Sequence, residues 1–137
     1  MADFGALGCA FFSENLRHRY VDVEGGRGIE VEIDDSMRGP AGSVHGGLIA
    51  MLVDVAGATC LAMATERAVA TASATTQYLA AGRVGPIRAI GSPLRVSDSL
   101  GVAEVRVSDV GKDNRLMAIA HVTCGFLSGD GFTYKRA

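Results

Sequence analysis

Residues 45–65 read HGGLIAMLVDVAGATCLAMAT, an apolar run with a single acidic residue, Asp54, near its middle. Residues 46–64 contain no proline and are numerous enough for a helix of about five turns. Because apolar residues occur all round such a helix, the pattern predicts that it is buried. An ionised carboxylate in apolar surroundings is costly unless it is paired or faces a polar cleft. The sequence therefore predicts a cleft lined by Asp54.

The side of this helix that carries Asp54 is otherwise made of small residues and one methionine. On a period of 3.6 residues, the neighbours of the acid on that side are Gly47, Ala50, Met51, Gly57 and Ala58. Small side chains allow a ligand or another backbone to approach the helix closely. This stripe supports the prediction of a cleft beside the acid.

The start of the helix has the features of an anion-binding site. Ser43 offers a hydroxyl for the N-cap, and Gly46 and Gly47 leave the first backbone N–H groups uncovered by side chains. Such a helix start attracts negative charge. One helix thus offers a place for an oxyanion at its beginning and an acid or base two turns later, which suits acyl transfer.

The composition fits one domain covering residues 1–137, with residues 1–17 as an N-terminal arm or short helix. The net charge is −2 and no basic run occurs, so nucleic acid is not expected as a partner. The three cysteines are widely spaced and form neither a disulfide framework nor a zinc motif. The acid and the glycines in the apolar run argue against a membrane span. We therefore expect a cytoplasmic protein without a metal site.

Segments typical of strands surround the predicted helix. Residues 18–33 alternate around a glycine-rich turn at residues 25–28 and predict a hairpin with one solvent-facing side. Residues 34–44 have the Gly, Pro and Ser content of a loop. Further strands are predicted at residues 69–79, 87–97, 102–108 and 116–127, with turns short enough to make neighbours antiparallel. The predicted class is α+β, with the long helix covering one face of an antiparallel sheet.

The order of these elements and two short motifs resemble a known family. Residues 42–47 read GSVHGG and residues 52–54 read LVD, so the acid follows the histidine by nine residues. Thr71, seven residues before Tyr78, resembles the strand position at which the family carries Ser or Thr. Over roughly residues 18–127 the chain resembles the hotdog-fold acyl-CoA thioesterases of the phenylacetate-degradation (PaaI-like) type.

The resemblance implies hydrolysis of an acyl-CoA thioester to a carboxylic acid and free coenzyme A, without a cofactor. It implies that Asp54 is the nucleophile or general base, that the backbone N–H of Gly46 polarises the thioester carbonyl, and that Thr71 positions water or the acid. The expected substrate-binding residues around them are His45, Gly47 and Met51.

The resemblance also implies an assembly. In this family an antiparallel sheet of about five to six strands wraps round the central helix, and two subunits form a continuous sheet with active sites at their interface. We therefore expect a homodimer, and a homotetramer built from it. The spacing of the residues supports a shared site independently, because Gly46 and Asp54 are eight residues apart, or about 12 Å along one helix. A two-fold axis that lays a second helix alongside would bring Gly46 of one chain near Asp54 of the other.

One position departs from the family pattern and leaves two alternatives open. The family often carries Asn or Gln six residues before the histidine, and that position is Gly39 here. The first alternative is therefore a non-catalytic, acyl-CoA-binding or regulatory hotdog module. The second is an enoyl-CoA hydratase or dehydratase of the same fold, although the histidine lies at the helix start and not across a cleft from the acid.

Overall fold

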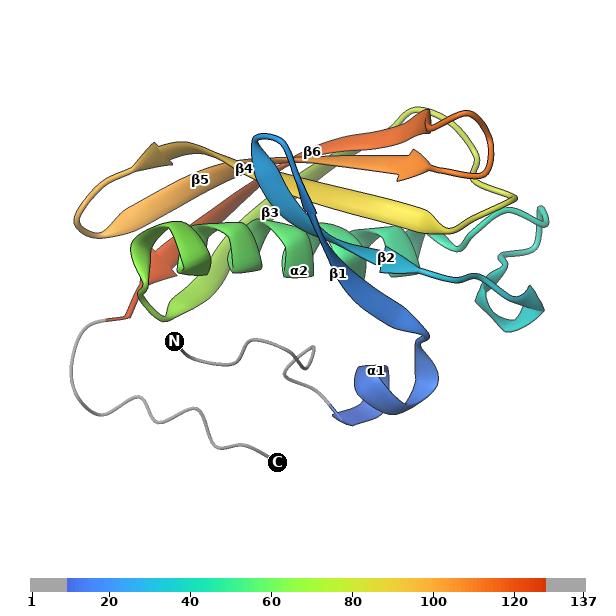
Figure 1. Ribbon diagram of the computed structural model, residues 1–137, viewed down its shortest axis with the longest axis horizontal. Helices are drawn as coiled ribbons and strands as arrows, with labels where there is room; N and C mark the ends of the chain where they lie inside the picture. Colours follow the sequence, from blue (N-terminus) through green and yellow to red (C-terminus); the bar gives the residue numbers. More distant parts are fainter. Residues whose placement is uncertain (1–9, 128–137) are drawn as a thin grey trace.

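The structure is a computed structural model that describes residues 10–127. One long helix, α2 (Gly46–Thr65), lies against a six-stranded antiparallel sheet (Figure 1). The strand order is β1-β2-β4-β5-β6-β3. The other elements are α1 (Ala10–Asn15), β1 (His18–Val23), β2 (Gly26–Val31), the 3₁₀ helix η1 (Asp35–Met37), β3 (Val69–Tyr78), β4 (Ile87–Val96), β5 (Leu100–Asp109) and β6 (Arg115–Phe126). The expected α+β hotdog fold is confirmed. Residues 1–9 of the expected N-terminal arm lie outside the described residues.

The N-terminus of α2 is capped by a different residue from the one expected. His45 is the N-cap, with extended backbone angles of φ −61° and ψ 134°. Its ring nitrogen Nδ1 accepts a hydrogen bond of 2.9 Å from the N–H of Gly47. The prediction of Ser43 as the N-cap was wrong, because the chain turns into the helix two residues later.

Only part of α2 is buried, although its composition predicted burial all round. Leu52, Val53 and Leu61 pack into the core between the helix and the sheet. The sheet covers one side of the helix, so Ala50 and Asp54 on the opposite side are exposed. The expectation of a fully buried helix was therefore wrong.

Two glycines are required by close packing. Gly57 was expected beside Asp54, but it faces the sheet, where an added Cβ would lie 2.7 Å from the side chain of Val122. Gly28 was expected in the hairpin turn, but it lies in β2, where a Cβ would lie 2.0 Å from the carbonyl oxygen of Ala89. Both glycines let a neighbouring element approach closely.

Strand β3 forms one edge of the sheet and pairs with β6 alone in the described part of the chain. Most of its residues are exposed on both faces. Its sequence, VATASATTQY, contains no charged residue or proline. Edge strands without such residues readily pair with another chain. The strand that lies beside Asp54 is therefore also the strand most suited to pairing with a second copy.

A buried carboxylate holds the loop between β3 and β4. Asp109, 1% exposed, accepts hydrogen bonds at Oδ2 from the N–H groups of Arg83 (2.8 Å) and Val84 (3.0 Å). Its Oδ1 accepts a bond of 2.7 Å from the N–H of Gly85. Burial alone would raise the pKa of Asp109, but these backbone hydrogen bonds outweigh it and hold the pKa below its ordinary value. The ionised form of Asp109 thus stabilises the fold.

Replacing Asp109 by Ala is expected to lower the free energy of unfolding by about 3–5 kcal/mol, because buried N–H groups lose their acceptor. The pKa is lower in the folded state, so the stabilisation is present above the unfolded-state pKa and is lost as the pH falls through the folded-state pKa. In urea titrations, the advantage of wild type over Asp109→Asn should therefore shrink below about pH 4. The control is Asp113→Asn, a substitution of an exposed acid in the β5–β6 turn. Equal midpoints at pH 7 for wild type and Asp109→Asn would contradict this role.

Candidate functional site

The structure brings Asp54 and Thr71 together. Asp54 lies on the exposed side of α2, and Thr71 lies near the start of β3. The Thr71 hydroxyl Oγ1 donates a hydrogen bond of 2.7 Å to Oδ1 of Asp54. This bond leaves the second carboxylate oxygen of Asp54 available on an exposed surface. An exposed, oriented carboxylate can act as a base or as a nucleophile.

The nearby thiols are poor candidates for the same chemistry. Cys124 is buried, and its Sγ lies 3.7 Å from Oγ1 of Thr71. Burial is the main cause that raises the pKa of Cys124, the hydrogen bond between its thiol and Thr71 opposes it, and the charge of Asp54 raises the pKa further. Burial also raises the pKa of Cys60 to about 12. Both thiols are therefore protonated near neutral pH, which favours Asp54 as the reactive group.

The start of α2 leaves one amide free. The N–H of Gly47 is bonded to the His45 ring, and the N–H groups of Leu48 and Ile49 are bonded to the His45 carbonyl. Within residues 10–127, no acceptor is paired with the N–H of Gly46. This amide lies at the positive end of the helix and can bind an oxygen that carries negative charge.

The expected substrate-binding residues occupy different environments. His45 is exposed and acts as the helix cap, and the N–H of Gly47 is used by that cap. Met51 is half-buried and packs against the core. Met51 lies three residues before Asp54 on α2, so it is placed on the same side of the helix as the acid.

Strand β3 runs back along α2 and joins it at a second place. The Tyr78 hydroxyl donates a hydrogen bond of 3.0 Å to the carbonyl oxygen of Gly46. One end of β3 thus contacts the helix at Asp54 and the other end contacts it at the helix start. The surface between these two contacts includes the exposed residues Ala50 and Ala74 and the half-buried Thr76. Sequence patterns indicate no role for Tyr78 beyond family spacing, because its contact with Gly46 depends on the course of β3.

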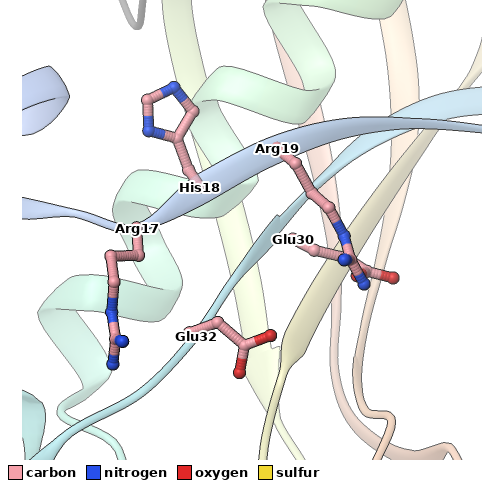
Figure 2. Close-up of a pocket in the computed structure, with 5 residues that line it drawn as sticks. All are labelled: Arg17, His18, Arg19, Glu30 and Glu32. Carbon is pink, nitrogen blue, oxygen red and sulfur yellow. The ribbon is translucent and has the colours of Figure 1, made fainter.

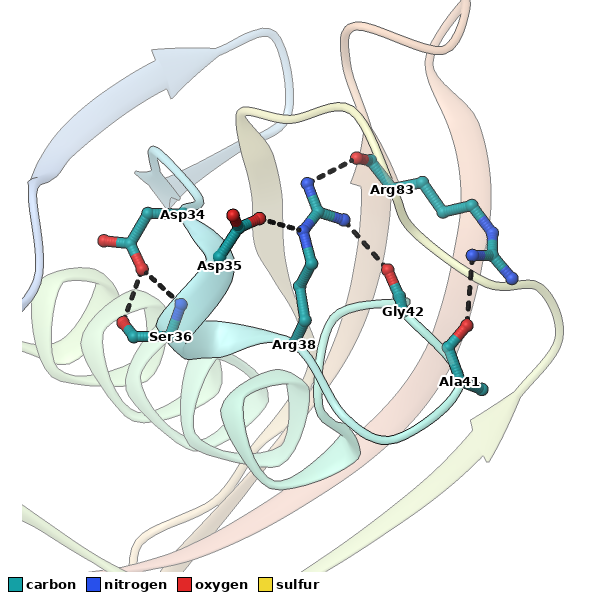
Figure 3. Close-up of polar contacts among 7 residues, drawn as sticks. All are labelled: Asp34, Asp35, Ser36, Arg38, Ala41, Gly42 and Arg83. Atoms are coloured by element: carbon teal, nitrogen blue, oxygen red, sulfur yellow. Dashed lines mark hydrogen bonds and ion pairs between the residues drawn. The ribbon is translucent and has the colours of Figure 1, made fainter.

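Two arginines fix the loop that leads into α2, as Figure 3 shows. Arg38 donates hydrogen bonds to the carbonyl oxygens of Gly42 (3.0 Å) and Arg83 (3.1 Å), and Arg83 donates to the carbonyl oxygen of Ala41 (3.2 Å). The N–H of Val44 donates to the carbonyl oxygen of Gly82. The β3–β4 loop and the loop before α2 therefore support each other and set the position of the helix start.

A hollow of about 180 Å³ lies at the other end of the strand order, on β1 and β2. Figure 2 shows its lining, which consists of Arg17, His18, Arg19, Glu30 and Glu32. Glu30 is 2% exposed and accepts hydrogen bonds from Nε of Arg19 (2.8 Å) and Nε of Arg88 (2.6 Å). Burial would raise the pKa of Glu30, but the two arginines lower it overall. Glu30 thus forms structural ion pairs with Arg19 and Arg88, and these lie apart from the surface at Asp54.

Residues 10–127 contain no group of three or more His, Cys, Asp or Glu side chains placed to hold a metal ion. Within that range, α2 is the one helix long and apolar enough to cross a membrane. Its buried residues pack against the sheet, as in the core helix of a globular fold.

A family model and several solved structures match the chain. The model of the thioesterase superfamily matches residues 41–117, which include Gly46, Asp54 and Thr71. A solved member of that superfamily is 26% identical, with a TM-score of 0.76 over 85% of this chain and 89% of that one. No curated protein sequence matches the chain.

Two further structures share the fold at lower identity. The PaaI protein of the E. coli phenylacetic acid degradation operon is 19% identical, with a TM-score of 0.71 over 85% of this chain and 84% of that one. A hypothetical thioesterase from Streptococcus pneumoniae, solved with coenzyme A, is 17% identical, with a TM-score of 0.72 over 82% of this chain and 87% of that one. The family match covers more than half of the chain, and these structures agree with it in fold. The chain therefore belongs to the thioesterase superfamily and has its hotdog fold.

Proposed function

We propose that this protein hydrolyses an acyl-CoA thioester to a carboxylic acid and free coenzyme A. The observation that carries the proposal is the exposed Asp54 carboxylate, oriented by a 2.7 Å hydrogen bond from Thr71, on the same helix as the free amide of Gly46. The structure of the Streptococcus pneumoniae protein with coenzyme A supports this choice of substrate class.

The site is shared between two copies of the chain. Gly46 and Asp54 both lie on α2 and are separated by about 12 Å along it, so one thioester carbonyl cannot contact both within one chain. The exposed, uncharged edge of β3 offers a surface on which a second copy can extend the sheet. Under two-fold symmetry such pairing creates two equivalent sites, each with Gly46 from one protomer and Asp54 from the other. A homodimer is the minimal active unit, and two such dimers form the expected homotetramer.

In the reaction, the N–H of Gly46 binds the carbonyl oxygen of the thioester as that oxygen gains negative charge. A donor of this kind typically contributes about 2.7–4 kcal/mol to lowering the barrier. Asp54 either attacks the carbonyl carbon, giving a mixed anhydride that water then hydrolyses, or removes a proton from an attacking water. Thr71 holds the carboxylate, and the thiolate of coenzyme A leaves and takes up a proton. His45 and Gly47 hold the helix start, and Met51 borders the acyl group.

The two routes differ in where the water oxygen goes. A single turnover in oxygen-18 water places the label in the Asp54 carboxylate if the anhydride forms and breaks by attack on the Asp54 carbonyl. The label enters only the acid product if water attacks the thioester directly. Label found by mass spectrometry in the peptide that contains Asp54 would therefore establish the anhydride route.

The test of the proposed function is a thiol-release assay with short, medium, long and aromatic acyl-CoAs. Turnover of at least one class by the wild-type protein is the expected result. Tight binding of acyl-CoAs without release of thiol would instead favour a binding module, which the glycine at position 39 permits. Hydration of an enoyl-CoA without thiol release would favour the hydratase alternative.

A further inference from the structure

Tyr78 places an aromatic ring at the free amide of the helix start. It is the last residue of β3, and two of its ring carbons lie 3.7 and 3.8 Å from the position that a Cβ on Gly46 would take. Its hydroxyl donates to the carbonyl oxygen of Gly46. One side of the ring is therefore held against Gly46, which is the residue whose N–H is free.

The rest of the Tyr78 side chain is exposed to an unusual degree for an aromatic residue. Tyr78 is 53% exposed, and the next residue, Leu79, is 55% exposed. An exposed ring is stabilised little by burial in the core, and the Tyr78 hydroxyl is already bonded to Gly46. The exposed face of the Tyr78 ring is thus an apolar surface beside the helix start. An apolar surface next to a reacting carbonyl is suited to contact the apolar part of a substrate.

Resting on the proposed function, we infer that Tyr78 is a positioning and specificity-determining residue. Its hydroxyl fixes Gly46, and its ring forms a wall against which the acyl group packs. Pantetheine is a less suitable neighbour, because its amides need hydrogen-bond partners that the ring does not offer. In the two-fold assembly the ring and Gly46 belong to the same protomer. The ring therefore lies beside Asp54 of the partner subunit.

The two parts of this role are separated by two substitutions. Tyr78→Phe keeps the ring and removes the hydrogen bond to Gly46. It should lower kcat by roughly 3- to 10-fold for every acyl group, with an unchanged order of preference. Tyr78→Ala removes the wall. It should shift kcat/KM toward bulkier acyl groups, so that the ratio between the largest and smallest substrates changes about 10-fold or more.

The experiment measures kcat and KM across a panel of acyl-CoAs that differ only in the bulk of the acyl group. Leu94→Ala is the matched control, because Leu94 is 56% exposed on β4, a strand that does not neighbour β3. Tyr78→Val repeats the loss of the ring with a residue favoured in strands, in case Tyr78→Ala does not fold. Thermal unfolding reports whether each variant is folded.

The outcomes separate this inference from the proposed function. If wild type is active, Asp54→Asn is inactive and the Tyr78 variants keep both the wild-type rate and the wild-type preference, the inference is overturned and the proposed function stands. An equal loss for all acyl groups in Tyr78→Ala or Tyr78→Val would overturn the acyl wall. Absence of thiol release by wild type would remove the proposed function and this inference together.

Discussion

Replacing Asp54 by Asn is expected to lower kcat for thioester hydrolysis by roughly 10²- to 10⁴-fold while the protein stays folded. The asparagine side chain has the same shape, and its amide oxygen can still accept the hydrogen bond from Thr71. The amide is neither a base nor a nucleophile near neutral pH. Asp54 is exposed, so its charge contributes little to stability. The loss should therefore appear in the chemical step.

The measurement is steady-state thiol release, with thermal unfolding as the check on folding. Asp98→Asn removes the same charge from an exposed position in the β4–β5 turn and should retain wild-type kinetics. A folded Asp54→Asn protein that hydrolyses acyl-CoA at the wild-type rate would exclude Asp54 as the reactive group.

Replacing Gly46 by Pro is expected to lower kcat by about 10²- to 10³-fold, because proline has no N–H to bind the developing oxyanion. Gly46 is the first residue of α2, a position that proline tolerates well. The preceding residue, His45, already has the extended backbone that proline requires before it. The substitution therefore removes one donor with little disturbance of the helix.

Gly46→Ala is the matched control for this variant. It keeps the N–H, and its Cβ would meet the Tyr78 ring at 3.7 Å, an ordinary contact distance. We expect Gly46→Ala to retain far more activity than Gly46→Pro. Similar losses of kcat in both variants would show that the added side chain, and not the missing N–H, lowers the activity. The oxyanion would then be bound by another donor.

The sequence predicts the main elements because their patterns are local. The helix expected at residues 46–64 is observed at Gly46–Thr65, and all six expected strands are present with small shifts at their ends. The errors arise where a contact with a distant element decides the outcome. Gly57 faces β6, which periodicity along one helix cannot reveal, and the cap is His45 because the preceding loop is held by Arg38 and Arg83.

The candidate site was predicted only in part for the same reason. Asp54 is conspicuous as the one charge in an apolar run, and the glycines at the helix start have a direct physical meaning. The pairing of Asp54 with Thr71 depended on family spacing, because they are seventeen positions apart in the chain, with a turn between them. Tyr78 and Asp109 act through contacts made only in the folded chain, so their roles emerge from the structure.

A hybrid of two inactive chains tests the shared site most directly. Asp54→Asn and Gly46→Pro proteins are mixed in equal amounts after separate purification, subunits are exchanged by unfolding and refolding together, and thiol release is measured. If each site takes Gly46 from one protomer and Asp54 from the other, half of the dimers are hybrids and each hybrid has one intact site. The mixture should then recover about a quarter of wild-type activity. A mixture that forms hybrid dimers yet stays as inactive as its parents would contradict a site built between two protomers.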